Sequence, residues 1–197
     1  MVTAVKGYFD TKILALIGVA IVINIIGGQL NDLLRLPIFL DSIGTILVAG
    51  LAGPIAGGVT GVLTNLVIGL LFAPVAAAFA PVALVIGVVA GLLARVGGFR
   101  TVWQAVISGA VIAAALTVIA VPIRIYLFGG VTGSGADFFI AYLSSVGQTL
   151  LSSVAFTVFG TNIADKVLSA VLVWGLVRQL PERLTSGYSY LHYSRRA

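Results

Sequence analysis

A few ionisable residues lie within long apolar stretches of this sequence, and they are its first candidates for chemistry. Arg124 follows a run of more than twenty mostly apolar residues, and Asp165 and Lys166 stand side by side in another such run. Ionisable groups in or beside a hydrocarbon layer are costly, so each is a candidate for a functional site. In a pocket of low dielectric, such groups fix the orientation of a polar ligand. The competing interpretation is structural ion pairing, such as Asp41 or Asp165 with Arg124 or Lys166, and we expect one or two such pairs.

Motifs for covalent or metal-assisted catalysis are missing. The sequence has no cysteine and a single histidine, His192, which argues against thiolate metal sites and histidine-based triads. It contains no phosphate-binding Gly-x-x-x-x-Gly-Lys-[Ser/Thr], no His-Glu-x-x-His and no Gly-x-Ser-x-Gly motif. We therefore predict no enzymatic activity, no cofactor and no metal site.

The composition indicates an integral membrane protein. Of the 197 residues, 60% are hydrophobic and only 9% are charged, and the mean hydropathy is +1.18. Soluble domains carry about 25% charged residues. The net charge of +5 does not indicate nucleic-acid binding, because the basic residues form no contiguous patch. We predict one transmembrane domain over residues 1–197.

The apolar runs predict an all-α bundle of six membrane-spanning helices, each near the length of about 20 residues that a bilayer requires. The first span is expected to be retained as an uncleaved helix. The predicted spans are Lys12–Leu34, Ile38–Ala52, Pro54–Phe72, Val75–Leu93, Val102–Phe128 and Ile163–Leu180.

An additional helical segment is predicted around 137–159, where polar residues interrupt an apolar stretch. Cytoplasmic flanks of membrane proteins are enriched in Lys and Arg. Six crossings place all the basic clusters on one side, and a seventh would move the basic tail to the other. The segment is therefore interpreted as an outer-face or re-entrant helix, and both termini as cytoplasmic. The basic clusters are Lys6 with Lys12, Arg95 with Arg100, and Arg178, Arg183, Arg195 and Arg196.

In this topology the costly polar residues collect in the outer half of the membrane, which predicts a polar chamber open to the outside. Several of them lie at or near helix ends on that side: Asp32, Arg35, Asp41, Asn65, Arg124, Asp137, Gln148, Asn162, Asp165 and Lys166.

Several segments resemble the substrate-binding S components of energy-coupling factor transporters. These are LPIFLDSIGT at 36–45, GPIAGGVTG at 53–61, LTNL at 63–66, NIADKVL at 162–168, and Leu180-Pro181. The resemblance extends over nearly the whole chain, including its length and hydropathy. It implies a subunit that binds a vitamin or related small molecule from outside. It also implies location in a prokaryotic plasma membrane, and partnership with a transmembrane scaffold subunit and two cytoplasmic ATPases.

The predicted substrate-binding residues come from two sources. The resemblance carries a site role over to Asp41, Asn65, Asn162, Asp165 and Lys166. Position in the polar outer half adds Arg124, Tyr126 and Gln148. The mixture of charges admits a zwitterion or a neutral heterocycle as ligand. An alternative function is a membrane sensor or receptor that binds a small ligand.

Overall fold

The computed structural model describes residues 9–34, 36–181 and 188, and this part of the chain is helical with no strand. Of the residues discussed above, Lys6, Arg35, Arg183, His192, Arg195 and Arg196 lie outside the described part. The helices are α2 (Thr11–Leu34), α3 (Ile43–Ala52), α4 (Pro54–Leu71), α5 (Val75–Ala78), α6 (Ala80–Arg95), α7 (Val102–Phe128), α8 (Asp137–Ser145) and α9 (Leu150–Gln179).

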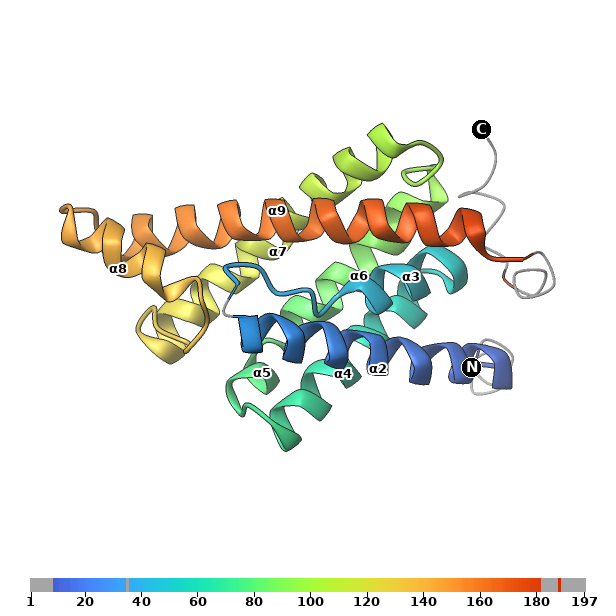
Figure 1. Cartoon of the computed structure of the whole chain (residues 1–197), viewed down its shortest axis with the longest axis horizontal. Coiled ribbons are helices and arrows are strands. Elements are labelled where there is room, and N and C mark those ends of the chain that lie inside the picture. The colour runs from blue at the N-terminus through green and yellow to red at the C-terminus, as the bar shows by residue number, and fades with distance from the viewer. Residues whose placement is uncertain (1–8, 35, 182–187, 189–197) are drawn as a thin grey trace.

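Helices α2 and α9 extend along the long axis of the molecule, and α7 crosses it obliquely (Figure 1). Helix α7 packs along α9, and α4 packs along α6. Helix α3 contacts α2, α4, α6 and α9, and every residue from Gly44 to Ala52 is buried. The short helices α5 and α8 lie toward one end, and α2 begins and α9 finishes at the other (Figure 1). The all-helical prediction is therefore confirmed for the described residues.

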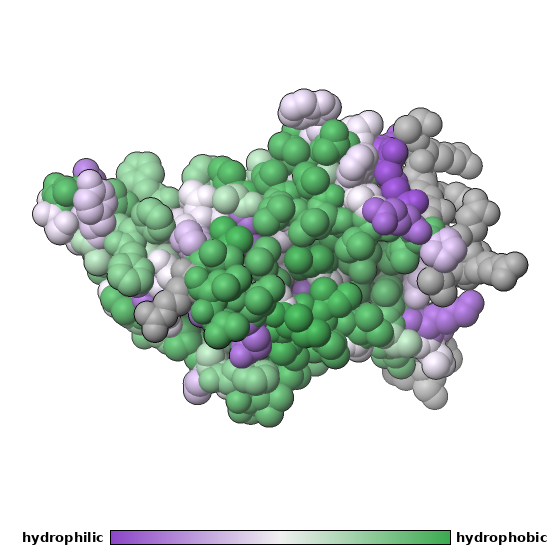
Figure 2. All heavy atoms as spheres, viewed as in Figure 1, coloured by the Kyte–Doolittle hydropathy of each residue, from purple (hydrophilic) through white to green (hydrophobic). Residues whose placement is uncertain are grey.

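Helix length and surface chemistry both fit a multi-pass membrane protein. Helices α2, α4, α7 and α9 are long and apolar enough to cross a bilayer, whereas α3 and α6 are shorter apolar helices. Large apolar side chains such as Ile26, Ile107 and Val118 are more than 60% exposed. Apolar residues cover the middle of the visible surface, and hydrophilic ones gather toward the end where the described chain begins and finishes (Figure 2). The number of crossings stays a prediction.

The second apolar segment differs from the expected span. Helix α3 begins at Ile43 instead of Ile38 and has 10 residues, so it is only about 15 Å long. The preceding residues 36–42 are not helical, and Leu40 adopts a positive φ of 52°. Pro37 supplies no backbone N–H, and side chains of other helices bind N–H groups farther along the segment. The chain thus enters the bundle as an irregular segment and becomes helical at Ile43.

The last helix is longer than predicted, and this changes the interpretation of 137–159. Helix α9 begins at Leu150 and continues for 30 residues, so 150–159 belongs to it and is not a separate surface segment. Thr149 caps its N-terminus by accepting a hydrogen bond from the Ser152 N–H at 3.3 Å. Helix α8 has nine residues, about 14 Å, which is too short to cross a bilayer. The fourth predicted span is likewise divided, into α5 and α6 at Phe79.

Glycine allows α4 and α6 to pack with their backbones in contact. A Cβ added at Gly87 of α6 would lie 2.2 Å from the carbonyl carbon of Gly57 in α4. Small residues permit such approach where lipid supplies no hydrophobic driving force between helices. Gly175 of α9, in contrast, has nothing within 4 Å of the added Cβ.

We expect Gly87→Ala to lower the free energy of unfolding by about 2 kcal/mol, because α4 and α6 must separate to admit the methyl group. Gly175→Ala is the matched control, and it should be neutral or stabilising by up to about 1 kcal/mol through its helix propensity. Denaturant unfolding of both variants in the same detergent measures the difference. Equal stability of the two variants would contradict the close packing of α4 on α6.

Candidate functional site

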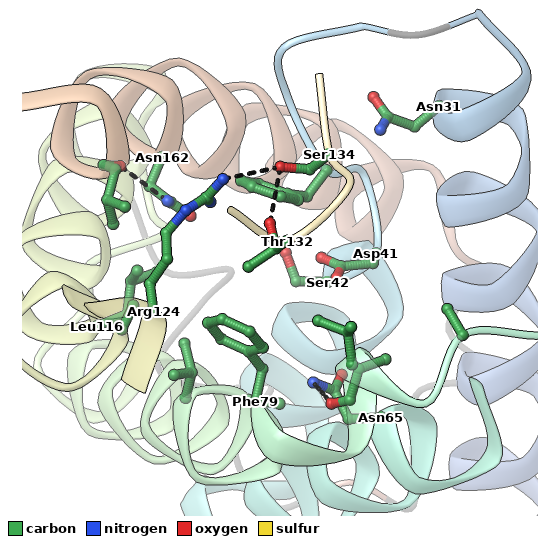
Figure 3. Close-up of a pocket in the computed structure, with 18 of the residues that line it drawn as sticks. Asn31, Asp41, Ser42, Asn65, Phe79, Leu116, Arg124, Thr132, Ser134 and Asn162 are labelled. Carbon is green, nitrogen blue, oxygen red and sulfur yellow. Dashed lines mark hydrogen bonds between the residues drawn. The ribbon is translucent and has the colours of Figure 1, made fainter. Parts of the chain in front are cut away.

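A cavity of about 650 Å³ lies among the helices, toward the end that carries α5 and α8 (Figure 3). Its lining comes from the end of α2, residues 36–45, α4, α5, α6, α7, the loop before α8, α8 itself and α9. This volume falls in the range of about 300–1,000 Å³ that small-molecule sites occupy. Nearly every element of the bundle therefore contributes to one cavity.

One wall of the cavity is apolar. Phe79 stands between α5 and α6, and its ring stacks on Phe128 with centroids 5.8 Å apart. Leu116 and Ala120 of α7 line the cavity with Val158 of α9. An apolar wall beside a few oriented polar groups is the usual composition of a ligand site.

A buried charge cluster joins α9 to the segment that leads into α3. Lys166 and Asp165 are 1% and 0% exposed and form an ion pair. Lys166 Nζ also donates a hydrogen bond to Ser42 Oγ at 2.8 Å and lies 3.7 Å from Asp41 Oδ1. Asp165 Oδ1 accepts a hydrogen bond from the Leu40 N–H at 2.8 Å. The cluster thus holds the non-helical backbone against α9.

Asn24 of α2 binds the first turn of α3 and also contacts α4. Its Oδ1 accepts a hydrogen bond from the Gly44 N–H at 2.7 Å. Its Nδ2 donates to Thr45 Oγ1 at 2.9 Å and to Thr64 Oγ1 at 3.1 Å. Asn24 is fully buried and lies outside the cavity lining, so it fixes α2, α3 and α4 relative to one another.

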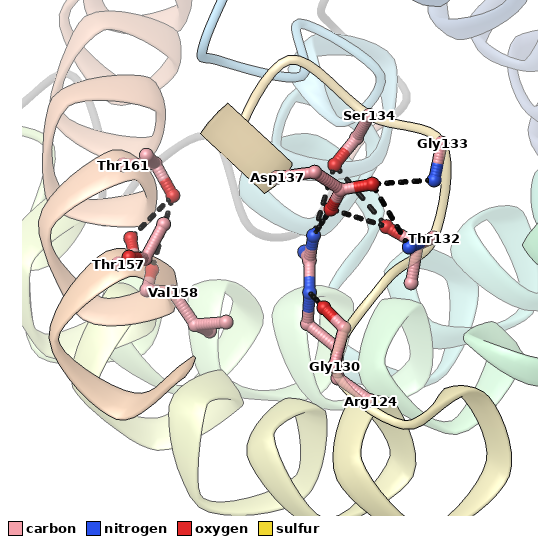
Figure 4. Close-up of polar contacts among 9 residues, drawn as sticks. All are labelled: Arg124, Gly130, Thr132, Gly133, Ser134, Asp137, Thr157, Val158 and Thr161. Carbon is pink, nitrogen blue, oxygen red and sulfur yellow. Dashed lines mark hydrogen bonds and ion pairs between the residues drawn. The ribbon is translucent and has the colours of Figure 1, made fainter. Parts of the chain in front are cut away.

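A second ion pair shapes the loop that covers part of the cavity (Figure 4). Arg124 is 3% exposed and is paired with Asp137 at the start of α8. Its guanidinium also donates to Gly130 O at 2.9 Å and to Ser134 Oγ at 3.2 Å. Asp137 Oδ2 accepts hydrogen bonds from two successive backbone N–H groups, those of Thr132 and Gly133. The loop is therefore held in place by hydrogen bonds to one Arg–Asp ion pair.

Most of the predicted site residues are brought together. The cavity lining includes five of them: Asp41, Asn65, Arg124, Asn162 and Lys166. Asp165 lies behind Lys166, fully buried and outside the lining. Their roles in binding a substrate stay predictions.

Tyr126 and Gln148 lie away from this group. Tyr126 is 85% exposed. It lies two residues beyond Arg124, which is about 200° around the helix, so its side chain faces the side opposite to Arg124. Gln148 is exposed in the turn before α9, where it accepts a hydrogen bond from Ser152 Oγ at 3.1 Å. Neither side chain lines the cavity.

Other lining residues were not among the predicted site residues. Asn31 is 5% exposed, and its Oδ1 is buried without a hydrogen-bond partner. An amide within an apolar span is a signal that could have singled out both Asn24 and Asn31. Others carry common side chains that give no such signal, among them Ser42, Thr45, Phe79, Thr132 and Ser134.

Metal-binding groups are not clustered in the part of the chain that the structure describes. No three residues among its His, Cys, Asp and Glu are placed to hold an ion. Comparison of the chain with protein-family models, with curated proteins and with solved structures gave no match.

We expect Asp165→Ala to lower the free energy of unfolding by about 3–5 kcal/mol, because it leaves Lys166 buried beside a weaker partner and the Leu40 N–H without an acceptor. The double variant Asp165→Ala, Lys166→Met removes the buried charge as well and should recover part of that loss. Thermal or denaturant unfolding in detergent gives both values. A double variant less stable than the single one would contradict a structural role for the pair.

We expect Asp137→Ala to release the loop at 130–137, because Arg124 and two backbone N–H groups lose their common acceptor. Hydrogen–deuterium exchange should rise in this loop and stay unchanged in α3 and α4. The control is Asp10→Ala, which removes a carboxylate that accepts only the exposed Ile13 N–H in a helix cap. Unchanged exchange in the loop of Asp137→Ala would show that the ion pair does not hold it.

Proposed function

We propose that this protein is the substrate-binding membrane subunit, or S component, of an energy-coupling factor transporter. It would capture a vitamin or related small molecule from outside the cell for ATP-driven uptake. The observation that carries the proposal is the cavity of about 650 Å³, lined by both apolar and ionisable side chains within an apolar bundle. Buried charge in a membrane bundle is costly and gathers at substrate sites.

The proposed topology has six crossings, with both termini in the cytoplasm. Its support is the distribution of charge along the bundle. Lys12, Arg95, Arg100 and Arg178 belong to the helix ends opposite α5 and α8, and a cytoplasmic face is enriched in such residues. Helix α3 would complete the second crossing together with the non-helical residues 36–42. Irregular backbone at membrane depth is tolerated where it is buried in protein or lines a cavity.

The proposal requires partners that supply energy. The sequence has no phosphate-binding loop for ATP, so a transmembrane scaffold subunit and two cytoplasmic ATPases would provide it. A small-ligand sensor would use the same cavity but would associate with a signalling protein. Co-purification with ATPases therefore supports the transporter, and co-purification with a kinase alone supports the sensor.

We expect the purified chain to retain or bind one small molecule in the cavity, detected by mass spectrometry after denaturation and by calorimetric titration. Ala120→Phe should weaken binding at least about tenfold, since Ala120 lines the cavity and a phenyl group would occupy it. Val118→Phe, two residues earlier on α7 and 73% exposed, is the matched control and should bind as the wild type does.

Both variants are first compared by size-exclusion profile and melting temperature, so that misfolding is distinguished from a blocked cavity. Wild-type affinity in a well-folded Ala120→Phe would reject the cavity as the binding site. Absence of any bound or binding small molecule would reject the proposed function.

A further inference from the structure

In the part of the chain that the structure describes, the two cationic side chains that line the cavity are already bound to protein acceptors. Arg124 is bonded to Asp137, Gly130 O and Ser134 Oγ. Lys166 is bonded to Asp165 and Ser42 and is held near Asp41. A ligand anion would have to compete with these buried partners, and breaking a buried ion pair is strongly unfavourable. The cavity is therefore poorly suited to an anionic ligand.

The amide side chains of the lining present oxygen atoms to the cavity. Asn65 Nδ2 donates to Ala76 O at 3.1 Å, and Asn162 Nδ2 donates to Val158 O at 2.8 Å. A backbone carbonyl can only accept, so these contacts fix the amide nitrogens toward the protein and leave the oxygens for a ligand.

Asn31 gives the strongest indication of what a ligand must supply. It is 5% exposed, and its Oδ1 has no hydrogen-bond partner in the structure. Its side chain extends from α2 toward the cavity, on the side where Asp41 and Ser134 lie (Figure 3). A buried acceptor left unpaired costs about 1–3 kcal/mol, so a ligand that donates an N–H or O–H here would recover that energy.

Carboxylates exceed cations around the cavity. Among the described residues there, Asp32, Asp41, Asp137 and Asp165 face only Arg124 and Lys166, an excess of two negative charges. Asp137 and Asp165 are bound tightly by those cations. Asp41 is 3.7 Å from Lys166 Nζ, which is longer than a hydrogen bond, and Asp32 is exposed at the cavity. The excess charge thus lies on Asp32 and Asp41.

We propose that the cavity selects an organic cation that carries hydrogen-bond donors, such as a protonated amine or an amino-substituted cationic heterocycle. This inference rests on the proposed function and names its substrate class. The positive charge would lie near Asp41 and Asp32, and an N–H would meet Asn31 Oδ1. The apolar part of the ligand would contact Phe79, whose ring face also attracts a cation.

The test is calorimetric titration of the purified chain with a panel balanced by charge. Pyridoxamine and pyridoxine form a matched pair, because an amine in the first replaces a hydroxyl in the second. Thiamine is a further cation, and biotin and pantothenate are anions. The charge of any co-purified compound is determined by mass spectrometry in parallel. We expect the tightest ligand to be a cation and pyridoxamine to bind more tightly than pyridoxine.

Variants locate the charge that is recognised. Asp41→Asn and Asp32→Asn keep the side-chain shape and should each weaken binding of the tightest cation about tenfold or more. Asp10→Asn removes one negative charge near the start of α2, about 30 Å along that helix from Asp32, and should leave the affinity unchanged. Melting temperatures of the ligand-free variants identify any loss of folding.

The outcomes separate this inference from the proposed function. A neutral or anionic compound as the tightest or co-purified ligand would overturn the selection of a cation and leave the binding subunit in place. The same holds if a cation binds Asp41→Asn and Asp32→Asn, both well folded, as tightly as the wild type. No co-purified compound and no binding from the panel would overturn the proposed function together with this inference.

Discussion

The arrangement of the bundle depends on one constraint, which is that residues 36–42 enter the protein interior without forming a helix. A helix satisfies its own backbone hydrogen bonds, but an irregular, partly buried segment of a membrane bundle needs partners from elsewhere. Asp165 accepts the hydrogen bond of the Leu40 N–H, and Asn24 accepts that of the Gly44 N–H. These two side chains come from the last and the first described long helices. The start of α3 is thereby fixed between them, and α3 is the helix around which α2, α4, α6 and α9 pack.

The cavity follows from the same constraint. Because α3 is only 10 residues long, it leaves the space above its first turn to be bounded by side chains instead of by a continuing helix. Asp41, Ser42 and Thr45 line that space from the entry to α3. Lys166 neutralises Asp165, the carboxylate that binds the Leu40 N–H, and Lys166 itself lines the cavity. Structure and site therefore share residues here, and a substitution at Asp165 or Lys166 affects both.

The sequence predicted the helical class and the position of most helices, because long apolar runs leave few alternatives. Four details of the structure could not be predicted from the local sequence. Residues 38–40 are apolar enough to begin a helix, and the tertiary contact of Leu40 to Asp165, which accompanies their irregular path, cannot be seen in the sequence. Residues 150–159 contain serines that are typical of an interruption, yet α9 accommodates them. Tyr126 and Gln148 were assigned to the site only from their expected depth in the membrane. Depth does not tell which way a side chain faces. In the sequence, Asn31 is simply a polar residue at the end of a predicted span. Only the three-dimensional structure shows that its side-chain oxygen has no hydrogen-bond partner.

The structure also changes which residues carry information about a ligand. From sequence, Arg124 and Lys166 are the most conspicuous candidates, because a cation in an apolar run is the costliest feature. In three dimensions both cations are satisfied by Asp137 and Asp165, and each pair holds a segment of backbone in place. Under the proposed function, the groups left to recognise a ligand would be the less conspicuous ones, namely the amide of Asn31 and the carboxylates of Asp32 and Asp41. In a bundle of low dielectric, the tightly paired charges stabilise the fold, and specificity would come from the polar groups that the protein binds less tightly.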